Sequence, residues 1–398
     1  MAITYGKNYG RPTLDLNFAE NKSLIDSVTG RNLITFSRSQ SGKEATYVGS
    51  DGLIKYAGAD EPRFDYNPTT GESLGLLIEE QRTNLFNNSN FRGSWFVFGT
   101  AQRDFNAGIA PDGTNTAVLL TCDTSFENLL QYNISGSNNT LSVFVKKGTK
   151  NLLDIVDNSS NFFCQINLNN WTPTVQTNCT VSIIPYPNDW YRILVKNITN
   201  IGNYVKIGSR AYLDGGTVYL WGVQLEQGTF PTSYIPTSGS TVTRNADEAS
   251  ITGTNFSSWY NQGDGTFYGK GSQIYSNASN EFESLIQVGN NPNRSWAWAI
   301  INTINWWDAG TDGLNVGQFS RTLTPNAPFN YSVAQAQKNN DGAISSDGVI
   351  VATSAPIQTI YTNSNILYIG YNNYNGHISR LTYWPKRLPD LELQQLTK

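Results

Sequence analysis

Apolar and polar residues alternate along many short stretches of this chain. In LSVFVKK (141–147), Leu141, Val143 and Val145 fall on one side of an extended backbone, and Ser142 and Phe144 lie between them. Such a period of two is typical of a strand with one buried face. WYRILVKNI and VYLWGVQLE behave similarly. In the second, the same spacing is expected to place four residues on one face: Tyr219, Trp221, Val223 and Leu225.

About eight strands of this kind, separated by Gly, Asn and Pro turns, are predicted in residues 91–236. This spacing is typical of a two-sheet β-sandwich or jelly roll. Residues 217–226 are predicted to be its final strand. Pro231 and Pro236 then interrupt regular structure, and residues 237–247 are predicted to be a linker.

The same pattern returns in residues 248–398, which predicts a second sandwich. This part closes with PDLELQQLTK, where Leu391, Leu393 and Leu396 form a brief helical stripe and Asp390 is the expected N-cap of a short helix. The fold class is therefore predicted to be all-β, with an N-terminal strand-rich docking module followed by two β-sandwich (jelly-roll) domains.

Residues 1–90 contain short strand candidates but little apolar sequence for a deep core of their own. We therefore expect an extended docking or attachment module. Its open strand edges would be satisfied by a neighbouring subunit or another protein.

Composition narrows the functional classes. Charged residues make up 15% of the 398 residues and the net charge is −4, without a basic stripe, which argues against nucleic-acid binding. No stretch resembles a signal peptide or a membrane-spanning run, so we expect no membrane insertion. The cysteines Cys122, Cys164 and Cys179 are expected to be buried and reduced, although Cys164 and Cys179 could face each other across a hairpin.

Few residues suggest catalysis. Glu79 and Glu80 are adjacent, so on a strand they point to opposite faces, and we expect them to pair with Arg82 or with other basic residues. His377 is the chain's only histidine and is expected at the surface or at a strand end. A hydrolase built from scattered carboxylates remains an alternative, but we expect no enzymatic activity.

Two kinds of binding site are candidates. Trp306 and Trp307 are adjacent, so one is expected to point outward, and with Asp308 they form a candidate glycan-binding platform. DAGTDG (308–313) offers oxygen ligands and Gly turns, so Asp308 and Asp312 are candidate Ca²⁺ ligands, although the spacing does not match an EF-hand. Ordinary turns and core tryptophans are the competing interpretation, and no other cofactor is expected.

Five stretches carry a resemblance to a known family: RPTLDLNFAE (11–20), ATYVGSDGLIKYA (45–57), EPRFDYNPTTGESLGLLIEEQRTNL (61–85), WGVQLEQGTFPTSYIPTSGSTVTRNAD (221–247) and NGHISRLTYWPKRLPDLELQQLT (375–397). The chain resembles bacteriophage virion proteins of the tail fibre or head fibre type. Its middle part is similar to carbohydrate-binding jelly rolls, and its last part resembles concanavalin A-like (laminin G-like) sandwiches.

The resemblance implies a virion protein made in the host cytoplasm. We expect a tail fibre or other appendage subunit, attached to other virion proteins through residues 1–90, that recognises host-surface polysaccharide. Appendages are usually homotrimers, so a homotrimer is expected. A capsid head fibre or decoration protein and a tailspike-like polysaccharide depolymerase are the alternatives.

Overall fold

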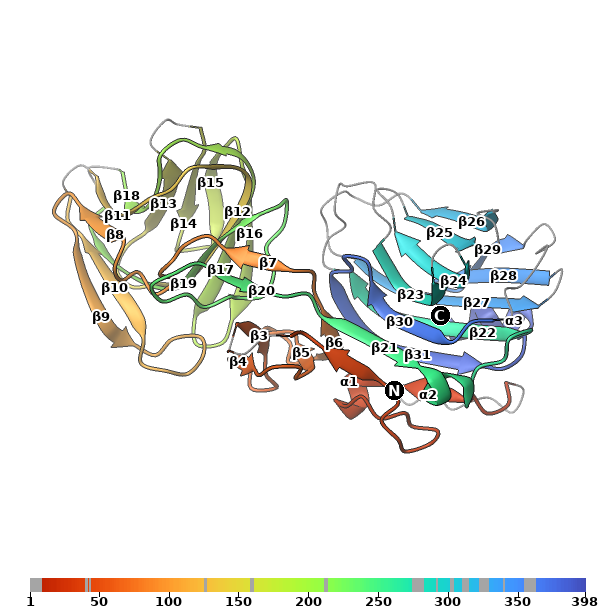
Figure 1. Cartoon of the computed structure of the whole chain (residues 1–398). Helices are drawn as coiled ribbons and strands as arrows, with labels where there is room; N and C mark the ends of the chain where they lie inside the picture. Colours follow the sequence, from red (N-terminus) through yellow and green to blue (C-terminus); the bar gives the residue numbers. More distant parts are fainter. Residues whose placement is uncertain are drawn as a thin grey trace.

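The computed structural model describes residues 9–39, 42, 44–124, 127–157, 161–210, 214–273, 283–290, 293–300, 304–309, 315–321, 329–338, 341–353 and 363–398. It confirms the predicted all-β class: antiparallel sheets form two sandwiches that lie side by side (Figure 1). Among the described residues, no helix is both long and apolar enough to cross a membrane.

The first sandwich is built from two six-stranded sheets, with strand orders β16-β17-β12-β19-β10-β9 and β15-β14-β13-β18-β11-β8. Its strands are β8 Trp95–Phe98, β9 Gln102–Gly108, β10 Ala117–Cys122, β11 Asn128–Asn133, β12 Gly136–Lys147, β13 Leu152–Asp157, β14 Phe163–Asn167, β15 Thr172–Thr177, β16 Thr180–Tyr186, β17 Trp190–Ile201, β18 Tyr204–Ser209 and β19 Gly216–Gln227.

The core of this sandwich follows the alternation of the sequence. Leu141, Val143 and Val145 all point into it, as predicted. Cys122, Cys164 and Cys179 are also buried there, and all three are free thiols, so no disulfide joins Cys164 to Cys179. The inward-facing aliphatic side chains of both sheets supply the apolar burial that holds the sandwich together.

A bulge in β19 changes the face that its side chains present. Gly222 has φ +59, and the pairing of β19 with β12 shifts register beside it. Before the bulge, Trp221 packs on the outer side of its sheet; after it, Val223 and Leu225 point into the core. The expectation that Tyr219, Trp221, Val223 and Leu225 share one face was therefore wrong. A left-handed residue inserted into a strand reverses the alternation beyond it.

The proline-rich exit runs back along β19 without joining the sheet. Proline has no N–H to donate to a ladder, so side chains bind this segment instead. Gln224 Oε1 accepts from the Ile235 N–H at 2.6 Å, and Glu226 Oε2 accepts from the Thr232 N–H at 3.0 Å. Gln224 and Glu226 are both fully buried. The exit is therefore a fixed part of the fold.

The second sandwich has an eight-stranded sheet, with β29-β28-β27-β22-β31-β6-β5 in order and β1 paired beside β31, and a five-stranded sheet with the order β2-β21-β30-β23-β24. Its elements are β1 Leu14–Leu16, α1 Phe18–Asn21, β2 Thr35–Ser37, β5 Arg63–Tyr66, β6 Ser73–Ile78, β21 Glu248–Thr252, α2 Gly253–Ser257, β22 Gly265–Gln273, β23 Glu283–Asn290, β24 Asn293–Ile300, β27 Phe329–Lys338, β28 Asp341–Ser346, β29 Val349–Thr353, β30 Ile366–Tyr371, β31 Gly376–Trp384 and α3 Asp390–Leu396. The separate pair β25 Ile304–Ala309 and β26 Asn315–Arg321 lies in the same half (Figure 1).

The expected closing helix is present as α3, but its start differs from the prediction. Pro389 occupies the N-cap, and Asp390 is the first helical residue, where its carboxylate pairs with Arg387 at 2.6 Å. Leu393 and Leu396 are buried against the outer face of the large sheet, whereas Leu391 is 65% exposed. Proline suits the helix start because the first turn needs no N–H donor there.

Residues 1–90 do not form a unit of their own. β1, β5 and β6 belong to the eight-stranded sheet of the second sandwich, and β2 pairs with β21. Leu14, Leu16 and Leu76 are fully buried in that sandwich's core. The shortage of apolar residues was a correct observation. The segment overcomes it by pairing its strands with residues far along the same chain, which leaves those edges satisfied within one subunit.

The hairpin of β3 (Ala45–Val48) and β4 (Ile54–Ala57) packs instead on the first sandwich. Val48 and Ile54 bury themselves against Trp190, Trp221 and Phe144. The two strands that cross between the sandwiches, β7 (Arg82–Asn84) and β20 (Val242–Arg244), pair with each other (Figure 1). The first ninety residues thus bind both sandwiches of their own chain.

Candidate functional site

A buried cluster of charges lies where the crossing strands enter the second sandwich. Arg63 Nη1 lies 2.7 Å from Glu79 Oε2, and Arg244 Nη1 lies 3.0 Å from the same oxygen. Asp247 accepts from Arg63 through Oδ2 and from Arg38 Nη1 through Oδ1, the latter at 3.0 Å. All five side chains are essentially inaccessible to solvent. Buried charges of this kind persist only when each one is paired.

The proline-rich exit completes this cluster. The Ser233 N–H and hydroxyl each donate to the Glu79 carboxylate at 2.7 Å. Burial alone would raise the pKa of Glu79, but Arg244, Arg63 and the Ser233 bonds outweigh burial and hold that pKa well below its ordinary value. Glu79 is therefore an anchor, ionised at neutral pH, between β6 and the exit segment.

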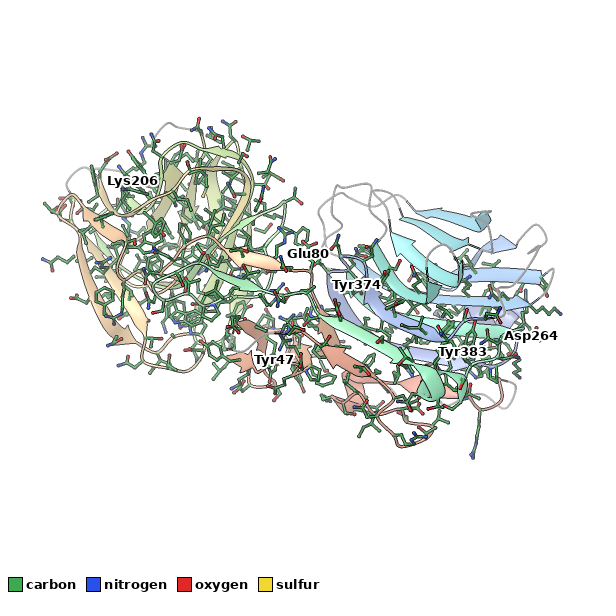
Figure 2. All side chains as sticks on the ribbon, viewed as in Figure 1. Tyr47, Glu80, Lys206, Asp264, Tyr374 and Tyr383 are labelled. Atoms are coloured by element: carbon green, nitrogen blue, oxygen red, sulfur yellow. The ribbon has the colours of Figure 1, made fainter. Side chains whose placement is uncertain are left out.

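Glu80 has a different environment from its neighbour. Its carboxylate pairs with Arg82 at 2.5 Å, as the sequence suggested, yet burial raises its pKa despite the nearby guanidinium groups. In Figure 2, Glu80 lies between the two sandwiches, and Tyr374 lies on the adjoining edge of the second. The two carboxylates thus face different surroundings, as predicted for adjacent residues of an extended chain.

A hollow of about 320 Å³ opens beside Glu80, on the outer face of the five-stranded sheet. This volume lies within the roughly 300–1,000 Å³ that ligand pockets occupy. Its lining combines carboxylates, amides, phenols and one aliphatic hydroxyl: Glu79, Glu80, Asp247, Glu248, Ser250, Tyr368, Tyr371, Asn372, Asn373 and Tyr374. Glu80 also lines a second hollow, of about 670 Å³, with Arg82, Thr83 and Asn138. The two hollows meet at Glu80, and together they are called the linker groove.

Tyrosines form the accessible apolar surface of the linker groove. The rings of Tyr368 and Tyr371 lie 4.4 Å apart between centroids, with their planes tilted by 31°. Tyr371 is 36% exposed, at the end of β30. Asn372 and Asn373 follow in the left-handed conformation, which turns the chain sharply and leaves both residues exposed at the rim. Aromatic faces beside amides and carboxylates can bind a sugar ring through its C–H groups and hydroxyls together.

His377 proved to be a buried residue. It is 6% exposed near the start of β31, so its place at a strand end was predicted correctly and its place at the surface was wrong. His377 Nε2 lies 2.7 Å from Asp65 Oδ2, and Nδ1 lies 3.2 Å from the Ser272 hydroxyl.

This Ser–His–Asp chain joins three strands of one sheet. The other Asp65 oxygen accepts from the Val48 N–H at 2.6 Å, which ties the β3–β4 hairpin to the second sandwich. The cavity that His377 and Asp65 line, about 190 Å³, is smaller than most ligand pockets. We interpret the chain of hydrogen bonds as a structural link between strands.

Three of the four sequence-predicted binding residues lie on a two-stranded sheet separate from the sheets beside the linker groove. Trp306, Trp307 and Asp308 belong to β25, paired with β26, but their side chains lie outside the described part of the structure. Asp312 also lies outside the described residues. Within the described residues, no three His, Cys, Asp or Glu side chains gather as metal ligands. Both the tryptophan platform and the Ca²⁺ site stay predictions.

The tyrosines of the linker groove were missed at the sequence level. The stretch ILYIGYNN offers one signal, because Tyr371 stands at the end of an alternating strand immediately before an Asn-Asn turn. Loop-proximal aromatics of this kind are candidates for recognition. Their meeting with Glu80 depends on pairing between residues almost 300 positions apart, which no local pattern reveals.

No family model and no curated protein matches the sequence. Among solved structures, the CBM40 of the Ruminococcus gnavus IT-sialidase, bound to α2,6-sialyllactose, is 20% identical, with a TM-score of 0.28; the match covers 36% of this chain and 88% of that one. A botulinum neurotoxin type C structure, reported with cell entry dependent upon interaction with two ganglioside molecules, is 12% identical, with a TM-score of 0.32, over 38% of this chain and 40% of that one.

The NanB sialidase of Streptococcus pneumoniae is 15% identical, with a TM-score of 0.30, over 37% of this chain and 26% of that one. Likenesses at this level carry no argument about the ligand or the activity of this protein. The functional argument therefore rests on the residues themselves.

Proposed function

We propose that this protein is a non-enzymatic subunit of a bacteriophage particle that binds host-surface polysaccharide, as part of a tail fibre or similar appendage. The linker groove is the observation that carries the binding role. It combines accessible tyrosine faces with carboxylates and amides on a rigid β scaffold. The resemblance of the motif stretches supports the place in a virion.

The scaffold suits an adhesin in physical terms. The buried ion pairs and the β7–β20 pair hold both walls of the linker groove in one arrangement, so binding a glycan costs little reordering of the protein. Single sugar contacts are weak. A homotrimer would present three grooves at once, and avidity would multiply their effect.

The first test is binding of the full-length protein to host cells and to extracted host polysaccharide, with Tyr371→Ala as the variant. Loss of one stacking ring should weaken affinity about fivefold, equivalent to about 1 kcal/mol. Tyr204→Ala is the matched control, because Tyr204 is half-buried on the first sandwich and lines neither hollow of the groove. Equal affinity of Tyr371→Ala and wild type would exclude the linker groove as the binding site.

A polysaccharide depolymerase is the second candidate, favoured by one observation. Glu80 lines the groove with a raised pKa, a property of general acids in glycosidases. Its ion pair with Arg82 argues for a structural role instead. The same binding samples should be assayed for released reducing ends. Release that disappears in Glu80→Gln would establish the enzyme, and no release would support the adhesin.

A head fibre or decoration protein differs in its partners. Such a protein would copurify with capsids rather than with tails. It would also bind neither host cells nor their polysaccharide. This result would favour a capsid role and would contradict glycan binding at the linker groove.

A further inference from the structure

A second hollow, of about 310 Å³, opens on the first sandwich, far from the linker groove in the fold. It lies where the turn between β14 and β15 meets β12 and β17, and it is here called the Trp171 hollow. Its lining combines two aromatic rings, two lysines, an amide and a carboxylate: Trp171, Tyr191, Lys146, Lys147, Asn169 and Asp189.

The two aromatic rings form a stacked pair. The centroids of Trp171 and Tyr191 lie 3.7 Å apart, and the planes differ by only 16°. Both side chains are half-buried, so the pair is packed on one side and open on another. Trp171 has φ +55, which costs a bulky residue of order 1–2 kcal/mol. Such strain tends to persist where the position of a side chain is useful.

Two lysines give this hollow an unusual charge for a chain of net charge −4. Lys146 Nζ donates to the Asn188 carbonyl at 2.9 Å, and Lys147 Nζ donates to Asn169 Oδ1 at 2.7 Å. Among the described residues, neither lysine forms an ion pair. An ammonium group has three N–H donors, so each lysine can also donate to a ligand. Asp189 is the single carboxylate in the lining, and it is exposed.

We infer that the Trp171 hollow is a second glycan site, selective for saccharides that carry a carboxylate. A sugar ring stacks on the open side of the Trp171–Tyr191 pair, and its carboxylate lies near Lys146 and Lys147. Asn169 accepts from and donates to hydroxyls at the edge, and the Asp189 carboxylate accepts from them. This inference rests on the proposed glycan-binding function, but it uses residues of a different sandwich from the linker groove.

The test uses the full-length protein on an array of immobilised oligosaccharides that contain uronic acids or sialic acid, beside the same oligosaccharides with the carboxyl groups reduced to alcohols. Wild type should bind the acidic forms at least tenfold more tightly than the reduced forms. That preference should shrink as salt is raised, because salt screens the lysine charges. Lys147→Gln should lose most of the preference, and Trp171→Ala should lose binding to both forms.

Lys270→Gln is the matched control, because Lys270 is an exposed lysine on β22 of the other sandwich. It should leave the preference unchanged, as should Tyr371→Ala. Lys147→Gln keeps the test decisive if Trp171→Ala fails to fold, because Lys147 contributes no ring to the core.

Two outcomes would overturn this inference, and they have different consequences for the proposed function. Acidic binding that survives Trp171→Ala and Lys147→Gln but is lost in Tyr371→Ala would place all recognition in the linker groove. The proposed function would then stand without a second site. No binding to any oligosaccharide on the array, acidic or reduced, would overturn the second site, and it would contradict the proposed function as well only if host cells and host polysaccharide are not bound either.

Discussion

Glu79 and Glu80 show how far neighbouring residues can differ in their electrostatics. Glu79 lies between Arg63 and Arg244, and its pKa is well below the ordinary value. Glu80 has one partner, Arg82, and burial raises its pKa. The first residue therefore stabilises the fold by its charge. The second holds a charge that burial disfavours, at the wall of the linker groove.

We predict that Glu79→Gln lowers the free energy of unfolding by about 3 kcal/mol at neutral pH, because two buried guanidinium groups lose a charged partner. The effect should also depend on pH. The folded pKa lies below the unfolded value of 4.5, so the charge contributes fully above pH 4.5, and the contribution is lost as acid protonates the unfolded chain.

Urea unfolding at several pH values measures both effects. Wild type should lose stability more steeply below pH 4.5 than Glu79→Gln does, so the two curves should converge in acid. Glu248→Gln is the control, since this exposed carboxylate should change stability by less than about 0.5 kcal/mol. Parallel stability curves for wild type and Glu79→Gln would contradict the lowered pKa of Glu79 in the folded protein.

At the scale of elements, β19 organises the first sandwich and its exit. Before the Gly222 bulge, Val218 and Leu220 point into the core and Trp221 faces the β3–β4 hairpin. Regular alternation beyond that point would turn Gln224 and Glu226 into the core and Val223 and Leu225 out of it. The bulge instead keeps Val223 and Leu225 in the core and leaves Gln224 and Glu226 to hold the proline-rich segment.

Replacing Gly222 by alanine should lower stability by about 2 kcal/mol. Its φ of +59 is costly for any residue with a Cβ, and that Cβ would lie 3.1 Å from the Phe144 ring. Thermal unfolding measures the change. Gly263→Ala is the control, because its nearest atom would be 3.8 Å away and its φ is not positive. Equal melting temperatures for the two variants would show that the bulge carries no strain-sensitive contact.

The alternation of the sequence was sufficient to predict the all-β class, the core face of Leu141, Val143 and Val145, and the closing helix. The alternation could not predict the bulge at Gly222. In the sequence, a glycine that interrupts the register of a strand cannot be distinguished from one that does not. The destination of β1 and β6 was also beyond local patterns, since both pair with β31, residues 376–384, and β5 joins the same sheet through β6. The linker groove was missed for the same reason.

At the scale of the whole molecule, the first sandwich is an insertion in the second. Residues 14–84 begin the second sandwich, residues 242–398 complete it, and the paired strands β7 and β20 mark the point of insertion. Figure 1 shows the marked C-terminal end of the chain in the second sandwich. The motif stretches that carry the family resemblance contain Arg63, Glu79 and Asp247 of the buried charge cluster. Their residues therefore stabilise this architecture, and they do not identify a ligand.

This arrangement predicts which fragments fold. Residues 248–398 alone lack β1, β5 and β6 and the core side chains of Leu14, Leu16 and Leu76, so they should be insoluble or lack a cooperative thermal transition. A chain that joins residues 1–84 directly to residues 242–398 through a short Gly-Ser turn should fold, because Asn84 and Val242 are cross-strand neighbours. Circular dichroism melting compares the two. A cooperative transition in the shorter fragment would contradict the nested architecture.

The pairing of β1 with β31 has a mechanical consequence. Leu14 and Tyr383 are cross-strand neighbours, although 369 positions separate them in the sequence. A pulling force applied between these two points is borne first by the hydrogen bonds of that strand pair. The inserted sandwich stays outside the path of the load while the second sandwich remains intact. A load applied there is therefore withstood by one half of the protein, and the Trp171 hollow in the other half keeps its shape.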